Sequence, residues 1–238
     1  SHHRNIMRDQ KILVVGGSSG IGLAIAKQAA SEGAQVVIGS RSSARLENAA
    51  TGHCHPLRTE QVDATSDESI NAFFSKIGEF DHLAVTIKPS LPSGQFSENN
   101  IDLVREAFDI KFWGQYRLAK AAIKNIKPTG SIVLTSGIAA HRGYRGYSIV
   151  SAMNAATEAL VKAISVELAP IRINAVCPGF VDTKPPNNKR LEYAQSVGAN
   201  FPLERLGQAE EVASAYIHLF KNTYASGCCL VVDGATSC

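Results

Sequence analysis

A glycine-rich segment near the N-terminus carries the residues best suited to bind an anion. The segment Val15-Gly16-Gly17-Ser18-Ser19-Gly20-Ile21-Gly22 follows a short apolar run and precedes apolar residues at helical spacing. Gly16 permits a tight turn, Gly20 lets a pyrophosphate approach the backbone, and Gly22 lets the helix pack closely on a sheet. The free N–H groups of the helix N-terminus then face the phosphates. An ordinary glycine-rich turn would not need this strand–loop–helix context, so we predict a dinucleotide site.

The end of the second predicted strand distinguishes between NAD and NADP. It reads Gly39-Ser40-Arg41-Ser42 and contains no acid, whereas an acid here accepts the hydrogen bond of the ribose 2′-hydroxyl in NAD-binding proteins. Arg41 makes charge-assisted bonds to a 2′-phosphate, and the hydroxyls of Ser40 and Ser42 add donors. We predict NADP(H) as the cofactor; a solvated surface arginine is the alternative.

These residues need a scaffold, and apolar runs that alternate with amphipathic segments predict one. Strands are expected at 11–15, 35–38, 58–62, 81–87, 131–135, 171–177 and 229–232, and helices at 22–32, 46–50, 67–77, 101–126, 148–168 and 210–220. Gly33, Pro128 and Pro170 are expected to end three helices, and Ser66 to cap one. The pattern predicts an α/β fold with a doubly wound, Rossmann-like parallel sheet of about seven strands and helices on both faces.

Composition limits the class of protein and its partners. The 238 residues are 45% hydrophobic with a formal net charge of +3, which suits one domain over 8–238 and indicates no nucleic-acid or membrane partner. Residues 1–7, which begin Ser-His-His, are expected to be disordered or tag-derived. No apolar stretch is expected to approach the ~18 residues of a membrane span. The five cysteines lack metal-ligand spacing, so we expect reduced thiols, no metal and a cytoplasmic protein.

The motifs together resemble those of the short-chain dehydrogenase/reductase family over 11–234. Besides the glycine loop, the resemblance rests on Asp63, on the segment Asn174 to Gly179 and on Val232-Asp233-Gly234. It implies that Asp63 lies beside the adenine and that the Pro–Gly segment lies near the nicotinamide. The cofactor contacts expected from the motifs and the resemblance are Gly16, Ser18, Ser19, Gly20, Ile21, Gly22, Ser40, Arg41, Ser42, Asp63, Ala64, Thr86, Ile110, Pro178, Gly179, Val181 and Thr183.

The catalytic positions of that family are altered. Members use a serine, a Tyr-x-x-x-Lys pair on one helix and an asparagine on the preceding helix. Ser136 matches the serine, but counting back from Pro178 without gaps places Val150 at the tyrosine position and Asn154 at the lysine position, with Lys111 at the asparagine position. The sequence therefore resembles an atypical member.

Two side chains, Lys111 and Tyr147, are candidates to restore the lost chemistry. Lys111 either returns the positive charge near the nicotinamide or extends outward into solvent. Tyr147 is an alternative acid, but it requires a shift of nearly one helical turn. The segment Tyr116-Arg-Leu-Ala-Lys120 has the Tyr-x-x-x-Lys spacing, but it lies on the preceding helix, so we expect it to have a surface or interface role. With Ser136, the candidate catalytic residues are thus Lys111, Tyr147 and Asn154.

Three functions remain open. The favoured one is an NADP(H)-dependent reductase with a rebuilt site that acts on an activated small molecule, an iminium ion or an enone, in secondary metabolism. The others are a non-redox cyclase or isomerase and a silent cofactor-binding protein. The loops 139–147 and 183–201 are expected on the substrate side. Small residues on the second long helix (Ala155, Ala156, Ala159 and Ala163) are compatible with a homo-oligomer, dimer or tetramer.

Overall fold

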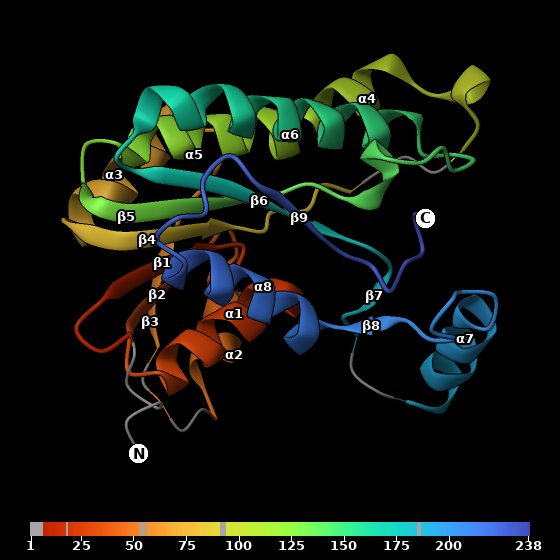
Figure 1. The fold of residues 1–238 in the computed structure, drawn as a ribbon, viewed down its shortest axis with the longest axis horizontal. Coiled ribbons are helices and arrows are strands. Elements are labelled where there is room, and N and C mark those ends of the chain that lie inside the picture. The colour runs from red at the N-terminus through yellow and green to blue at the C-terminus, as the bar shows by residue number, and fades with distance from the viewer. Residues whose placement is uncertain (1–6, 18, 53–54, 56, 91–93, 185–186) are drawn as a thin grey trace.

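The computed structural model describes residues 7–17, 19–52, 55, 57–90, 94–184 and 187–238, and its centre is a parallel sheet. Seven strands lie in the order β3-β2-β1-β4-β5-β6-β9, as Figure 1 shows. Their bounds are β1 Lys11–Val15, β2 Gln35–Ser40, β3 Arg58–Gln61, β4 Phe80–Val85, β5 Ile126–Thr135, β6 Arg172–Pro178 and β9 Cys229–Val232. This is the Rossmann-like architecture that the sequence predicts.

Helices cover both faces of the sheet and create two apolar cores (Figure 1). The helices are α1 Gly20–Ser31, α2 Ser43–Ala50, α3 Asp67–Ile77, α4 Ile101–Phe108, α5 Gly114–Ala122, α6 Ser148–Leu168, α7 Asn188–Gly198 and α8 Ala209–Lys221. The core on the α1 and α8 face includes Ile25, Val212 and Phe220. The core on the α3 and α5 face includes Phe73 and Leu118. Burial on both faces explains why the central strands read as continuous apolar runs.

Several helix and strand bounds were predicted correctly, because local signals define them. Helix α3 begins after Ser66, whose side chain accepts a hydrogen bond from the Ser69 N–H, as a side-chain N-cap does. Helix α6 and strand β9 also have the expected bounds.

The prediction of a single helix at 101–126 was wrong. The segment consists of α4, a π-helical turn at Asp109–Trp113 and α5, which ends at Ala122. Pro128 does not end the helix: it lies at an irregularity of β5, where the pairing with β4 shifts between Phe80 and His82. Proline is tolerated at such a place because the ladder hydrogen bonds are interrupted there.

Two further expectations need correction, and three elements were not predicted. Met7 is 1% exposed and packs in the first core, so the folded domain begins at least one residue before the expected boundary. Helix α6 meets the length and composition criterion of a membrane-spanning helix, although helices packed on a core meet it too, and α6 packs on β6. The sequence also did not predict α7 or the small sheet of β7 (Val181–Asp182) and β8 (Gly207–Gln208).

Candidate active site

A cavity of about 830 Å³ lies at the carboxyl ends of the central strands, where the strand order reverses between β1 and β4. This is the usual ligand position of an open α/β sheet. Of the expected cofactor contacts, those in its lining are Gly16, Ser19, Gly20, Ile21, Gly22, Ser40, Arg41, Ser42, Asp63, Ala64, Thr86, Ile110 and Thr183. Ser18 lies outside the described residues. The sheet thus brings together residues from most of the chain.

The glycine loop leaves its backbone accessible to a ligand. Gly16 adopts φ +89°, which favours glycine. A Cβ at Gly22 would lie 2.1 Å from the Gly16 carbonyl oxygen and 2.5 Å from Thr86 Oγ1, so only glycine allows α1 to approach β1 and β4 so closely. Helix α1 begins after its N-cap residue Ser19, and among the described residues no side chain accepts a capping hydrogen bond there. The first-turn N–H groups are therefore available to a diphosphate.

Two arginines line the cavity beside the end of β2. Arg41 was predicted, whereas Arg45 on α2 was not. Arg45 lies four residues after Arg41 and therefore outside the strand-end motif from which Arg41 was predicted. The Ser42 hydroxyl accepts a hydrogen bond from the Arg45 N–H and so caps α2. This cap holds the first turn of α2, and Arg45 with it, at the edge of the cavity.

Asp63 lies on the same side of the cavity, after β3. Its Oδ1 accepts hydrogen bonds from the Thr65 N–H at 2.9 Å and the Thr65 hydroxyl at 2.7 Å. These bonds lower the pKa of the carboxyl group, so Asp63 is ionised at neutral pH. Its ionised oxygens can accept a hydrogen bond from an adenine amino group.

Lys88 gives the other side of the cavity a positive charge, and a second lysine, Lys111, lies near it outside the lining. Lys88, which follows β4, lines the cavity, and burial lowers its pKa. Lys111 lies on the π-helical turn and donates from Nζ to the Ser136 carbonyl oxygen at 3.3 Å. Burial first, and then the charge of Lys88, lower the pKa of Lys111 to about 8. Lys111 therefore extends inward to the end of β5 and not into solvent.

Ser136 and Gly137, which follow β5, face different groups. The Ser136 hydroxyl donates to Glu158 Oε1 at 3.0 Å, and the same carboxylate oxygen contacts His141 Nε2 at 2.9 Å. A Cβ at Gly137 would lie 2.7 Å from Asn154 Nδ2. Residue 137, and not Ser136, therefore faces Asn154 from the end of β5, and because it is glycine it offers no side chain there. The catalytic role of Ser136 stays a prediction, and its hydroxyl is already engaged.

Helix α6 places the other candidates. Asn154 is 2% exposed, and its Oδ1 has no hydrogen-bond partner among the described residues. A buried acceptor without a partner is costly, and a ligand hydroxyl would satisfy it. Val150 lies one turn before Asn154. Tyr147 is the N-cap residue of α6, is 38% exposed, and its ring lies 5.9 Å from that of Tyr144.

Some predicted residues do not line the cavity. Pro178 ends β6, and the N–H of the next residue, Gly179, donates to the Val232 carbonyl. Val181 pairs with Gly207 in the small sheet. None of these three, nor the four candidate catalytic residues, is part of the lining. The Pro–Gly segment instead directs the chain to Thr183, which does line it.

Comparison with known proteins is consistent with this geometry. The sequence profile described as enoyl-(acyl carrier protein) reductase matches residues 15–236. The short-chain dehydrogenase/reductase ATR9 of Stachybotrys chlorohalonatus is 30% identical over 93% of this chain and 94% of its own. The peroxisomal 2,4-dienoyl-CoA reductase SPS19 of Saccharomyces cerevisiae is 31% identical over 85% of this chain and 75% of its own. A crystal structure of a small-chain dehydrogenase in complex with NADPH is 34% identical, with a TM-score of 0.83 over 96% of this chain and 98% of the other.

The chain therefore belongs to the short-chain dehydrogenase/reductase family, and it is a reductase-type member of it.

Proposed function

We propose that the protein is an NADP(H)-dependent reductase of an activated carbon–carbon double bond, such as that of an enone or enoyl compound. The observation that carries the proposal is the cavity that has arginines beside β2 and a lysine after β4. An NADPH-bound relative and the enoyl-reductase and dienoyl-reductase descriptions of the matches support it.

In this proposal, residues of the glycine loop, β2, β3 and α6 contact successive parts of the cofactor. The N–H groups of the glycine loop and of α1 bind the diphosphate. Arg41 and Arg45 bind the 2′-phosphate with charge-assisted hydrogen bonds, and Asp63 accepts from the adenine. The unpaired Oδ1 of Asn154 accepts a hydrogen bond from the nicotinamide ribose. NADPH, when bound, supplies the hydride.

The two lysines favour an enone over an iminium substrate. Hydride addition to an enone creates negative charge on the oxygen, and an ammonium group within a poorly solvated site stabilises that charge. An iminium ion already carries a positive charge, so Lys88 and Lys111 repel it. Because the pKa of Lys111 is about 8, most of this side chain is protonated at neutral pH and the repulsion applies there.

The altered catalytic positions agree with this substrate class. Reduction of a ketone needs a proton on the new alkoxide, which the family tyrosine gives, but Val150 has no proton to donate. An enolate is more stable than an alkoxide and takes its proton at carbon, from solvent or a nearby side chain. In this proposal Lys111 stabilises the enolate and Asn154 orients the ribose.

Calorimetry and a substrate panel test the proposal. Tight NADPH binding with weak NADH binding is expected, followed by loss of NADPH absorbance with enones and not with saturated ketones or iminium ions. No binding of either cofactor would refute the reductase assignment. Turnover of a substrate without NADPH consumption would indicate a cyclase or isomerase, and binding without any turnover a silent protein.

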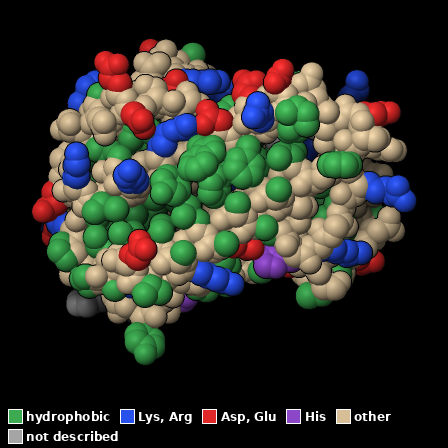
Figure 2. Space-filling model, turned by 90° about the horizontal axis from the view of Figure 1, so that it is seen from above, with side chains coloured by type: hydrophobic (Ala, Val, Ile, Leu, Met, Phe, Trp, Pro, Cys, Tyr) green, Lys and Arg blue, Asp and Glu red, His purple; other side chains and the backbone are tan. Residues whose placement is uncertain are grey.

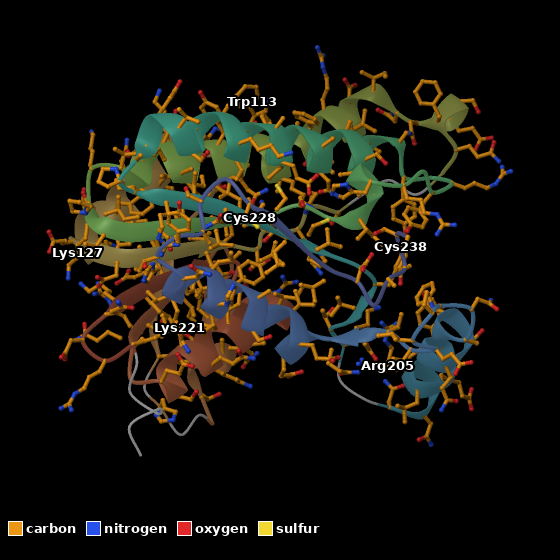
Figure 3. The ribbon with its side chains drawn as sticks, viewed as in Figure 1. Trp113, Lys127, Arg205, Lys221, Cys228 and Cys238 are labelled. Carbon is orange, nitrogen blue, oxygen red and sulfur yellow. The ribbon has the colours of Figure 1, made fainter. Side chains whose placement is uncertain are left out.

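We also propose that the protein forms a homo-oligomer through the α4–α5–α6 face. Figure 2 shows hydrophobic side chains gathered on this face, and Figure 3 places Trp113 on it. Trp113 is 44% exposed and contacts the rings of Phe112 and Tyr116. The adjacent hollow of about 420 Å³ is lined by Phe108 and Ile149 among others. An exposed apolar patch of this kind is typical of a contact between copies. A monomer in sedimentation analysis at micromolar concentration would refute the proposal.

A further inference from the structure

A cluster of nitrogen, oxygen and sulfur donors lies behind the end of β5, outside the cavity lining. His141 follows the short helix Ile138–Ala140, Glu158 lies on α6 and Cys177 lies on β6. Their donor atoms lie within 4.8 Å of one another. The three residues are far apart in the sequence and form no motif of closely spaced ligands, so no metal is expected from the sequence alone.

The geometry is close to that of a metal site. Glu158 Oε1 contacts His141 Nε2 at 2.9 Å. Around tetrahedral Zn²⁺, with ligands about 2.0 to 2.3 Å away, neighbouring donor atoms lie roughly 3.3 to 3.7 Å apart. The His–Glu contact therefore has to open by less than about 1 Å. The other separations, which are within 4.8 Å, have to close by at most about 1 Å. Changes of this size need side-chain rotation and no movement of the sheet.

The cluster also offers an entry path and rigid support. The side chain of His141 is 42% exposed and that of Glu158 10% exposed, while Cys177 is fully buried. A cation thus enters past the imidazole and reaches the thiol last. The Ser136 hydroxyl, 3.0 Å from Glu158 Oε1, orients the carboxylate as a second layer around the ligands.

We propose that His141 Nε2, the Glu158 carboxylate and the Cys177 thiolate bind Zn²⁺, with water at the fourth position. The imidazole, carboxylate and thiolate set suits Zn²⁺ better than Mg²⁺ or Ca²⁺, which prefer oxygen ligands alone. Binding replaces the thiol proton by the metal and releases it to solvent. The ion joins β6 and α6 to the start of the loop 141–147 and fixes that loop. The proposal does not depend on the reductase activity.

The test uses Co²⁺ as a spectroscopic substitute for Zn²⁺ in the full chain without cofactor. Other donors are first removed in a background variant that carries His2→Ala, His3→Ala, His53→Ala, Cys54→Ser and His55→Ala. One equivalent of Co²⁺ should then give a thiolate charge-transfer band and the visible bands of tetrahedral Co²⁺, and Zn²⁺ should abolish both.

Matched variants assign the ligands. Cys177→Ser should lose the charge-transfer band. Cys228→Ser and Cys238→Ser, which change the two cysteines labelled in Figure 3, should keep it. His141→Ala should weaken Co²⁺ binding at least tenfold, and because His141 is exposed this variant is expected to fold. Zn²⁺ should raise the Tm of the background protein and not that of His141→Ala. A band that persists in Cys177→Ser, or no band in the background protein, would overturn the proposal.

Discussion

Replacing Lys111 by methionine is expected to make the protein more stable at neutral pH. Burial and Lys88 lower the pKa of Lys111 from 10.5 to about 8, so its protonated form is disfavoured in the folded state by about 3 kcal/mol. Methionine has a similar length and no charge, and it removes this cost. The variant also loses the hydrogen bond from Nζ to the Ser136 carbonyl, which costs about 1 kcal/mol. The net gain in the free energy of unfolding is about 2 kcal/mol at pH 7.

The sign of the effect depends on pH. Between about 8 and 10.5 the unfolded lysine binds a proton that the folded lysine does not, so the wild-type stability rises with pH across this window. The advantage of Lys111→Met should therefore be full below about pH 8, shrink as the pH rises, and reverse to a deficit of about 1 kcal/mol near pH 10.5, where only the lost hydrogen bond remains.

Urea denaturation followed by circular dichroism at several pH values measures this dependence. Lys120→Met is the matched control, because Lys120 is an exposed lysine on α5 and its loss should change little. If Lys111→Met were less stable than the wild type at pH 7, the burial argument would be refuted. If it were more stable yet fully active, Lys111 would have no role in the enolate chemistry.

Variants in the cofactor cavity and at the buried His82 test the same geometry. Gly22→Ala should abolish NADPH binding in calorimetry, since its Cβ would overlap the Gly16 carbonyl, whereas Gly143→Ala, with no atom within 4 Å of the added Cβ, should bind normally. Arg41→Ala and Arg45→Ala should each weaken NADPH binding by about tenfold or more and leave NADH binding unchanged; equal losses for both cofactors would contradict the 2′-phosphate assignment. Burial lowers the pKa of His82 from 6.5 to about 4, so the folded state loses up to about 3 kcal/mol of stability as the pH falls from 6.5 to 4. His82→Phe should flatten this loss in urea titrations, and an equal loss in the variant would contradict the assignment to His82.

The sequence predicts well what local signals determine. The cap at Ser66 and the glycine loop define their elements through nearby residues, and most of the predicted cofactor contacts line the cavity. Pro128 was misleading because its effect depends on the β-strand irregularity into which it fits. Arg45 was missed because its position depends on how α2 follows β2.

The sequence alone did not predict contacts between segments that lie far apart along the chain. The Ser136 hydroxyl points to Glu158 on the distant helix α6, and residue 137 faces Asn154 on the same helix. Alignment of residues with a family motif does not predict the direction in which each side chain points. The convergence of His141, Glu158 and Cys177 likewise depends on the packing of α6 on β6.

The π-helical turn at Asp109–Trp113 has an evolutionary consequence. Such a turn contains one residue more than an α-helix would need, so one deletion would convert the whole segment to continuous α-helix. Gln115 holds the second half in place through hydrogen bonds in both directions with the backbone of Thr135. The first half would then rotate by about 100°, the angle per residue of an α-helix. A deletion within the turn would thus move Leu103 and Glu106 away from the cavity together, while the second half stays bound to the end of β5.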